Sequence, residues 1–184
     1  VGYTFIGWTG SNGKTPELNV RISKGSINDK NYTANWIERT DTKYTIKYYL
    51  QDINSSSYSV QDDLTKIKTG VTESTVIIDS QIEKVKGFTF EKAKVDNKEV
   101  SSTNILADGS RVIELYYSRN KYTITLKNDD GIKSVNGSGT YSFGESVTID
   151  AIEKDDYEFT KWVGSNEVTE KRYTFIMPDA NLTY

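Results

Sequence analysis

The chain has 184 residues, and its hydrophobic content of 35% predicts several shallow cores rather than one deep core. Its formal net charge is -3 with both signs interspersed, which gives no electrostatic basis for binding nucleic acid or an anionic membrane. It contains neither Cys nor His, which excludes disulfides, thiol chemistry and the catalytic triads that use a His base.

A spaced aromatic pattern occurs near both ends of the chain. Residues 2–8 read GYTFIGW and residues 156–162 read DYEFTKW, so in each the Tyr and Phe are two apart and the Trp follows three after the Phe. Residues 87–90 (GFTF) repeat the start of this pattern. Residues two apart on a strand share a face, so the paired rings are predicted to point into a core. The recurrence predicts three related or analogous modules.

The central part of the chain predicts strands flanking a helix. Apolar and polar residues alternate over residues 44–50 and 111–117, which predicts a strand in each. A short strand is predicted over residues 76–78 and a short helix over residues 79–86. The apolar residues of the helix recur at i, i+4 and i+7: Ile78, Ile82 and Val85. This order of elements predicts a β-grasp fold.

The C-terminal part predicts strands throughout. A last hairpin is predicted to join residues 173–176 to residues 182–184 through the turn at residues 178–181. The earlier strands are predicted over three alternating segments, residues 122–126, 147–151 and 157–162. The turns between them are predicted at residues 128–131 and 137–139.

The predicted linkers are short. They cover residues 37–43 and 118–121. Short joints favour semi-rigid beads over freely tumbling domains. The sequence thus predicts a mainly β protein with one short helix, built from tandem small β-grasp-like modules in an elongated arrangement.

The first module carries a family resemblance. Residues 2–8, residues 22–26 (ISKGS) and residues 32–36 (YTANW) resemble the second half of the internalin B-type B-repeat, or Listeria-Bacteroides repeat. That resemblance implies a small β-grasp module, found in tandem in Gram-positive surface proteins. Its first half would precede Val1, so we expect residues 1–37 to be a truncated module. A signal peptide and an anchor are likewise expected outside residues 1–184.

The C-terminal residues resemble the divergent B-repeat of clostridial and related surface proteins. The resemblance covers residues 122–184, which departs from the usual pattern by carrying Asp156 where Gly is usual before the Tyr. The segments that carry it are residues 131–141, 144–148, 157–162 and 175–179.

The middle residues are similar to the mucin-binding-protein-like repeat of Gram-positive adhesins. Residues 48–50, 87–88 and 116–120 carry this similarity. A shared fold does not establish a shared ligand, so mucin binding is not inferred from it. We therefore expect a first module over residues 1–37, a middle module over residues 38–121 and a C-terminal module over residues 122–184, and we keep these names below.

Three pairs of adjacent carboxylates are the candidates for acid–base chemistry. Neighbours on a strand point to opposite faces, so such a pair cannot flank one bond, and Asp is favoured in turns for local hydrogen bonding. Residues 128–131 (NDDG) could bind calcium weakly, but a tight turn is the favoured interpretation. The pairs are Asp62 with Asp63, Asp129 with Asp130, and Asp155 with Asp156.

The three Trp residues are candidate platforms for sugar rings. The alternative is that each closes the small core of its module, because an aromatic side chain buries roughly 150–250 Å². We expect Trp8 and Trp162 in cores, since their Tyr and Phe neighbours already define a buried face. Trp36 lies at the end of a strand beside a linker, so we expect it to be more exposed.

A Lys–Asn or Lys–Asp isopeptide cross-link is a further hypothesis for this chain. It needs a buried Lys, a facing Asn or Asp and a nearby carboxylic acid. Lys47, within an apolar strand, and Lys161, beside Trp162, are the only candidates. Lys is rarely fully buried unless paired, so a solvated Lys on the sheet is the favoured interpretation for both.

The sequence identifies no catalytic, cofactor-binding or metal-binding residue, and it assigns no ligand-binding residue. We therefore expect a monomeric, non-enzymatic repeat segment of a Gram-positive surface protein that needs no cofactor. Its expected role is that of a spacer or stalk that presents other domains, in a virulence-associated protein attached to the cell wall or secreted. The alternative is an adhesin module that binds a host protein or glycan through the Tyr-rich middle module.

Overall fold

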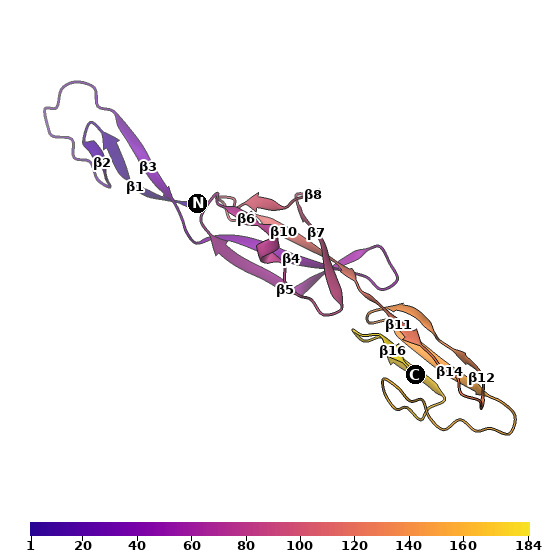
Figure 1. Cartoon of the computed structure of the whole chain (residues 1–184). Coiled ribbons are helices and arrows are strands. Elements are labelled where there is room, and N and C mark those ends of the chain that lie inside the picture. The colour runs from indigo at the N-terminus through magenta and orange to yellow at the C-terminus, as the bar shows by residue number, and fades with distance from the viewer. The chain divides into compact units, whose positions relative to one another are not determined.

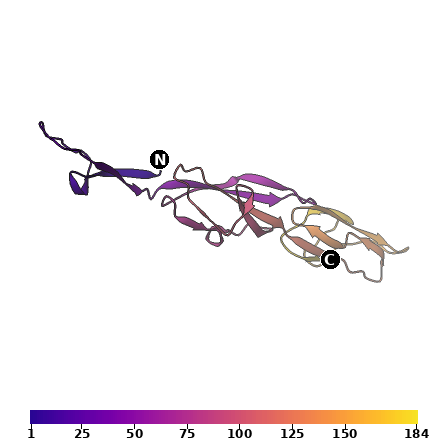
Figure 2. The same ribbon diagram turned by 90° about the horizontal axis from the view of Figure 1, so that it is seen from above.

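The structure is a computed structural model that describes all residues, 1–184, as two compact units. The first unit comprises residues 1–47, 62–81 and 93–114, and the second comprises residues 48–61, 82–92 and 115–184. Strands make up nearly all of the regular structure in both views (Figure 1, Figure 2). The prediction of a mainly β protein is therefore confirmed.

The N-terminal residues form a three-stranded antiparallel sheet in the order β2-β1-β3 (Figure 1). A bulge between Phe5 and Gly7 inserts one extra residue into β1. The extra residue brings Trp8 to the side of Phe5, and their rings meet edge-on at 5.4 Å. The bounds of the strands are β1 (Tyr3–Gly10), β2 (Gly13–Glu17) and β3 (Tyr32–Glu38).

This sheet has no apolar core of its own. None of the hydrophobic side chains of residues 1–37 is buried. Trp8 is 38% exposed and Trp36 is 58% exposed, with the ring of Phe5 packed between them. The prediction that Trp8 lies in a core is therefore wrong, because its aromatic neighbours form a surface cluster rather than a buried face.

The largest sheet has five strands in the order β5-β4-β10-β7-β8. Its first four strands follow the second–first–fourth–third order of a β-grasp sheet. A two-stranded antiparallel sheet pairs β6 (Thr75–Ile77) with β9 (Ser102–Asn104). The strands of the large sheet are β4 (Thr42–Gln51), β5 (Tyr58–Gly70), β7 (Phe88–Val95), β8 (Lys98–Glu99) and β10 (Val112–Arg119).

Alternation along β4 and β10 places one face of each strand inside. The hydrophobic residues buried on these two strands are Tyr44, Ile46 and Ile113 in the first unit. In the second unit they are Tyr48, Leu115 and Tyr117. In the second unit the rings of Tyr48 and Tyr117 stack at 5.9 Å. The period-two pattern read from the sequence thus gives the buried face of both strands.

The predicted helix over residues 79–86 is wrong. The structure has a single 3₁₀ turn, η1 (Ile78–Gln81), and no regular element from residue 82 to residue 87. The hydroxyl of Ser80 donates to the carbonyl of Ile77 at 2.7 Å. Ser and Asp side chains that bond the local backbone favour short turns over continued helix.

The C-terminal module consists of two three-stranded sheets. One has the order β13-β11-β16, and the other has the order β12-β14-β15. Their inner faces enclose an apolar cluster that includes Ile124, Ile149, Trp162 and Met177. The strands are β11 (Lys121–Thr125), β12 (Ile132–Asn136), β13 (Gly139–Ser142), β14 (Ser146–Glu153), β15 (Arg172–Ile176) and β16 (Leu182–Thr183).

The predicted C-terminal hairpin is wrong. β15 pairs with β14, whereas β16 pairs in parallel with β11, so the two segments lie in different sheets. The connection crosses between the sheets and is held at Met177, whose amide donates to the carbonyl of Glu145 at 2.8 Å. The side-chain oxygen of Asn181 then accepts from the amide of Thr123 at 2.8 Å. These long-range bonds outweigh the local turn signal.

The predicted strand over residues 157–162 is also wrong. These residues are irregular apart from one bridge between Trp162 and Val168. Tyr157 is 56% exposed, while Trp162 is 4% exposed and lies in the core as predicted. The Phe159 and Trp162 rings are 5.5 Å apart, so the Phe–x–x–Trp spacing produces an aromatic pair here as it does in β1.

The departure at Asp156 has a conformational consequence. Asp156 has φ 67°, in the left-handed region that Gly occupies without strain. We expect Asp156→Val to lower the free energy of unfolding by about 1–2 kcal/mol, because a branched side chain is strained at this φ. Asp156→Gly should change the free energy of unfolding by no more than about 0.5 kcal/mol. Gly relieves the backbone strain at this φ, but it also raises the conformational entropy of the unfolded chain, and the two effects oppose each other.

Urea denaturation of the full chain measures both changes. Asp155→Val is the matched control, because Asp155 lies in the same turn without a positive φ. Equal losses for the Val variants at residues 155 and 156 would show that the backbone conformation of Asp156 is not the cause.

Candidate functional site

The three pairs of adjacent carboxylates lie at the surface of the protein. All six Asp side chains of the three pairs belong to exposed residues. In the turn at residues 128–131, Asp129 Oδ1 accepts from the amide of Gly131 at 3.0 Å. No three His, Cys, Asp or Glu residues gather so as to hold a metal ion. The Asp129 contact is the local hydrogen bond for which turns favour Asp.

The two isopeptide candidates differ in setting. The ammonium of Lys161 pairs with the carboxylate of Glu167 at 3.1 Å, and the Lys161 side chain is 44% exposed. Lys47 is half-buried on β4. Lys161 therefore makes an exposed ion pair, which contributes little to stability.

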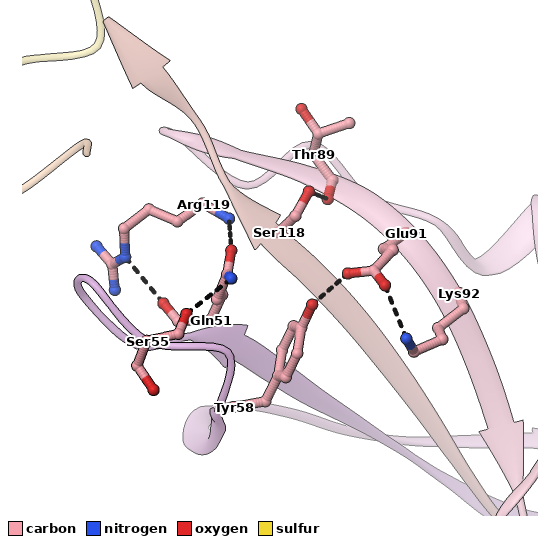
Figure 3. A network of polar contacts seen from close by, with 8 residues as sticks. All are labelled: Gln51, Ser55, Tyr58, Thr89, Glu91, Lys92, Ser118 and Arg119. Carbon is pink, nitrogen blue, oxygen red and sulfur yellow. Dashed lines mark hydrogen bonds and ion pairs between the residues drawn. The ribbon is translucent and has the colours of Figure 1, made fainter. Parts of the chain in front are cut away.

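The Tyr residues that were predicted to form an adhesive surface mostly pack against one another. Within the second unit, Tyr49 stacks on Tyr116 at 4.8 Å, and Tyr58 meets Tyr116 edge-on at 5.3 Å. The Tyr58 hydroxyl donates to the carboxylate of Glu91, which also accepts from Lys92 at 2.7 Å (Figure 3). The bond to Glu91 raises the pKa of Tyr58 to about 12. This surface is a closed network of partly buried rings.

Arg119, at the end of β10, is the centre of a second polar network in the same unit. Its Nε donates to the carbonyl of Gln51 at 2.8 Å, and its amide donates to the side-chain oxygen of Gln51 at 2.9 Å (Figure 3). Its Nη1 donates to the carbonyl of Phe143 at 2.9 Å, and its guanidinium lies 4.6 Å from the centre of the Phe88 ring. One side chain thus bonds residues of the middle module and of the C-terminal module.

The physical setting of Arg119 makes these bonds strong. Burial lowers the pKa of the guanidinium below its usual value, but Arg stays charged at any ordinary pH. Hydrogen bonds from a charged donor contribute roughly 1.5–3 kcal/mol each, about twice the neutral value. A planar guanidinium can donate in two directions at once while its face covers an aromatic ring, which Lys cannot do.

Backbone contacts reinforce this C-terminal joint, which we define as Gln51, Gly87, Phe88, Arg119, Asn120 and Phe143. The amide of Asn120 donates to the carbonyl of Gly87 at 3.0 Å, and the amide of Phe143 donates to the carbonyl of Asn120 at 2.8 Å. The rings of Phe88 and Phe143 meet edge-on at 5.9 Å. Asn120 alone separates β10 from β11, so the linker predicted over residues 118–121 is almost entirely part of strands.

A further polar contact lies beside the joint. Asn54 Nδ2 donates to Glu145 Oε1 at 3.0 Å, and Glu145 also accepts from the amide of Ser142 at 2.8 Å. The bond from Asn54 is the main reason that the pKa of Glu145 lies below its usual value. The contact is therefore strongest in the ionised form of Glu145 and weakens as the pH falls through its lowered pKa.

The first unit contains an analogous N-terminal joint, defined by Gly2, Arg39, Thr42 and Thr72. The carbonyl of Gly2 accepts from the amide of Arg39 at 2.9 Å and from the hydroxyl of Thr72 at 2.5 Å. The hydroxyls of Thr42 and Thr72 are 2.7 Å apart, and both residues are buried. Only residues 39–41 separate β3 from β4. This connection too is fastened by direct bonds.

Sequence reasoning missed both joints. It treated residues 118–121 as a linker and gave Arg119 no role. The available signal was an Arg two residues after the alternating run 111–117 and close to Tyr116 and Tyr117. An Arg in that context can satisfy strand-end carbonyls, but its partners come from residues 51, 88 and 143, which are distant in sequence.

The C-terminal module also has a cleft of about 690 Å³. It is bounded by the turn at residues 128–131 and by residues 157–164, and its floor includes Ile132, Val135 and Ala151. Aromatic side chains of this lining include the exposed Tyr157 and the partly buried Phe159. A volume of this size is within the range of small-ligand sites, about 300–1,000 Å³.

No helix in the structure has the length and apolar character needed to cross a membrane. The chain has just one helical turn, η1.

Comparison with known proteins gives one match. Residues 122–184 match the family model of the divergent InlB B-repeat domain, which confirms the resemblance of these residues to the divergent B-repeat. No curated protein and no solved structure matches the chain. The mucin-binding-protein-like similarity of the middle module stays a prediction. Residues 122–184 are therefore similar to the divergent InlB B-repeat domains, which indicates a repeat module of an extracellular or surface protein.

Proposed function

We propose that the chain is a non-catalytic spacer of a Gram-positive surface protein, attached to the cell wall or secreted, that presents other domains. The observation that carries this proposal is the C-terminal joint, in which Arg119 bonds Gln51 and Phe143 directly. A spacer transmits position only if its modules do not swivel freely. Direct bonds across a one-residue connection restrict the swivelling that a flexible linker allows.

The two joints support the same role in different ways. In the C-terminal joint, a charged side chain, an aromatic pair and backbone bonds act together. In the N-terminal joint, Thr72 donates to the carbonyl of Gly2 while its hydroxyl contacts that of Thr42. Neither set includes a reactive group, whereas each fixes the backbone on both sides of a connection.

The alternative role, an adhesin that binds through the Tyr-rich middle module, has less support. The rings of Tyr49, Tyr58 and Tyr116 contact one another, and the Tyr58 hydroxyl is bonded to Glu91. The packing of these rings against one another gives a structural reason for the Tyr-rich composition of this region. The spacer role is therefore the one that the geometry supports best.

A distance measurement across the C-terminal joint tests the proposal. The chain has no Cys, so Ser59→Cys with Lys133→Cys creates two unique sites for spin labels. Both residues are exposed and belong to the second unit. We expect pulsed electron paramagnetic resonance to give one narrow distance distribution, because the joint holds residues 58–61 and β12 of the second unit in a fixed relation.

The matched control adds Arg119→Ala to the labelled chain. We expect this variant to broaden the distribution while circular dichroism stays that of a folded β protein. A broad distribution in the chain that retains Arg119 would contradict the spacer proposal.

A further inference from the structure

We propose that the cleft of the C-terminal module binds a neutral oligosaccharide, with the ring of Tyr157 as its stacking platform. This inference goes beyond the spacer role and does not depend on it. It is based on an exposed aromatic ring held in place, an apolar floor, and unpaired polar groups at the rim. These are the features that a sugar chain, with its apolar C–H faces and its hydroxyl donors, can satisfy together.

The ring of Tyr157 is held although 56% of the residue is exposed. It packs directly against the backbone of Gly131, where a side-chain Cβ would lie only 2.6 Å from Tyr157 Cδ1. A residue larger than Gly at position 131 would push the ring away. Because the ring is already positioned, a ligand that stacks on it loses less conformational entropy on binding.

The backbone around the ring is also fixed. The Nζ of Lys154 donates to the carbonyl of Asp130 at 2.6 Å, and its amide donates to the carbonyl of Gly131 at 2.9 Å. The amide of Tyr157 donates to the carbonyl of Lys154 at 3.2 Å. The turn at residues 128–131 and the start of the 157–164 segment are thus tied to each other. The walls of the cleft are formed before any ligand arrives.

The rim carries acceptors that the protein leaves free. The carboxylates of Asp130 and Glu158 line the cleft and make no hydrogen bond or ion pair within the chain. By contrast, Glu153 is paired with Lys171 at 2.9 Å. Free carboxylates are strong acceptors for hydroxyl donors, and a neutral sugar offers several hydroxyls on each ring.

The charges of the cleft disfavour an anionic ligand. The lining has four carboxylates, on Asp129, Asp130, Glu153 and Glu158, and two ammonium groups, on Lys127 and Lys161. Glu153 is paired with Lys171 and Lys161 with Glu167, so the groups that remain carry an excess of negative charge that repels an anion. The same carboxylates can accept hydrogen bonds from the hydroxyls of a neutral sugar. The apolar floor, with Ile132 and Val135, provides the surface on which the C–H face of a pyranose ring can be buried.

Nuclear magnetic resonance titration of the full chain with cellohexaose and with chitohexaose tests this proposal. We expect at least one of these neutral β-1,4-linked hexasaccharides to shift amide signals of residues 127–132 and 157–164 in a saturable way. The absence of saturable shifts at millimolar concentration would overturn the proposal. So would shifts confined to other residues, or shifts with a Lys-rich peptide but with neither hexasaccharide.

Variants at Tyr157 separate stacking from general effects. We expect Tyr157→Ala to weaken binding about fivefold, which corresponds to the loss of about 1 kcal/mol of aromatic stacking. Tyr157→Phe keeps the ring and should retain the affinity. Trp36→Ala removes an exposed ring of the first unit and should leave binding unchanged. Equal affinity of the Tyr157→Ala variant and the parent chain would contradict the role of Tyr157, with folding checked by the dispersion of the same spectra.

Discussion

Gly87→Ala is expected to lower the free energy of unfolding of the chain by about 3 kcal/mol, through strain and overpacking at the C-terminal joint. Gly87 is buried with φ 77°, and an added Cβ would lie 2.1 Å from Cδ1 of the Phe143 ring. Phe143 cannot withdraw without losing its contact with Phe88 and the bond that its carbonyl accepts from Arg119. Urea denaturation measures the change.

Gly109→Ala is a matched control for this substitution. Gly109 has φ 75°, nearly the same as Gly87, but the nearest atom to an added Cβ is 3.6 Å away. It should therefore show only the conformational penalty, about 1 kcal/mol. The difference between the two variants isolates the clash with Phe143. If both Ala variants lose the same stability, Gly87 has no special role in the joint.

Arg119→Ala is expected to lower the free energy of unfolding by about 3 kcal/mol and to separate unfolding of the C-terminal module from that of the remainder. The side chain makes two hydrogen bonds to backbone carbonyls and a cation–π contact with Phe88. Removal leaves the carbonyls of Gln51 and Phe143 without this donor. Arg119→Lys should rescue only part of the loss, because one ammonium cannot reproduce the planar fork.

Urea denaturation followed by Trp fluorescence measures this effect, since the buried Trp162 reports on the C-terminal module. Arg39→Ala is the control, because the side chain of Arg39 bonds only the exposed Asp41. That surface pair should contribute little. A loss for Arg119→Ala no greater than for Arg39→Ala would remove the argument that Arg119 fastens the joint.

Local periodicity in the sequence was enough to predict two strands of the large sheet, β4 and β10, whereas β5, β7 and β8 were not predicted. β4 and β10 follow the alternation of residues 44–50 and 111–117, and their buried residues are those on the predicted face. Alternation works here because one face of each strand is covered and a slip of one residue would expose it. The same rule placed Val147, Ile149 and Ala151 inside the C-terminal module.

Prediction failed where a long-range contact outweighed the local signal. Tyr157 and Phe159 alternate as in a strand, but the 157–162 segment has no neighbouring strand to pair with apart from the bridge at Trp162. The segments at residues 173–176 and 182–184 are close in sequence but pair with strands from other parts of the module. The helix over residues 79–86 was inferred from three apolar residues, too few to establish a period.

The candidate sites were less predictable than the fold. The exposure of Trp8 depends on whether other residues cover its sheet, which alternation does not reveal. The C-terminal joint depends on residues 51, 87, 119 and 143 meeting in space, and the cleft depends on Gly131 admitting the ring of Tyr157. The family resemblance pointed to Asp156 as unusual, and its positive φ gives the physical reason.

Nitrogen-15 relaxation of the full chain tests the central claim, the fixed C-terminal joint, most directly. The joint predicts one rotational correlation time for the amides of residues 48–61, 82–92 and 115–184, the residues of the second unit. A clearly shorter correlation time for residues 122–184 than for the remainder of that unit would contradict the account, because it would show that the C-terminal module moves independently of Arg119 and its partners.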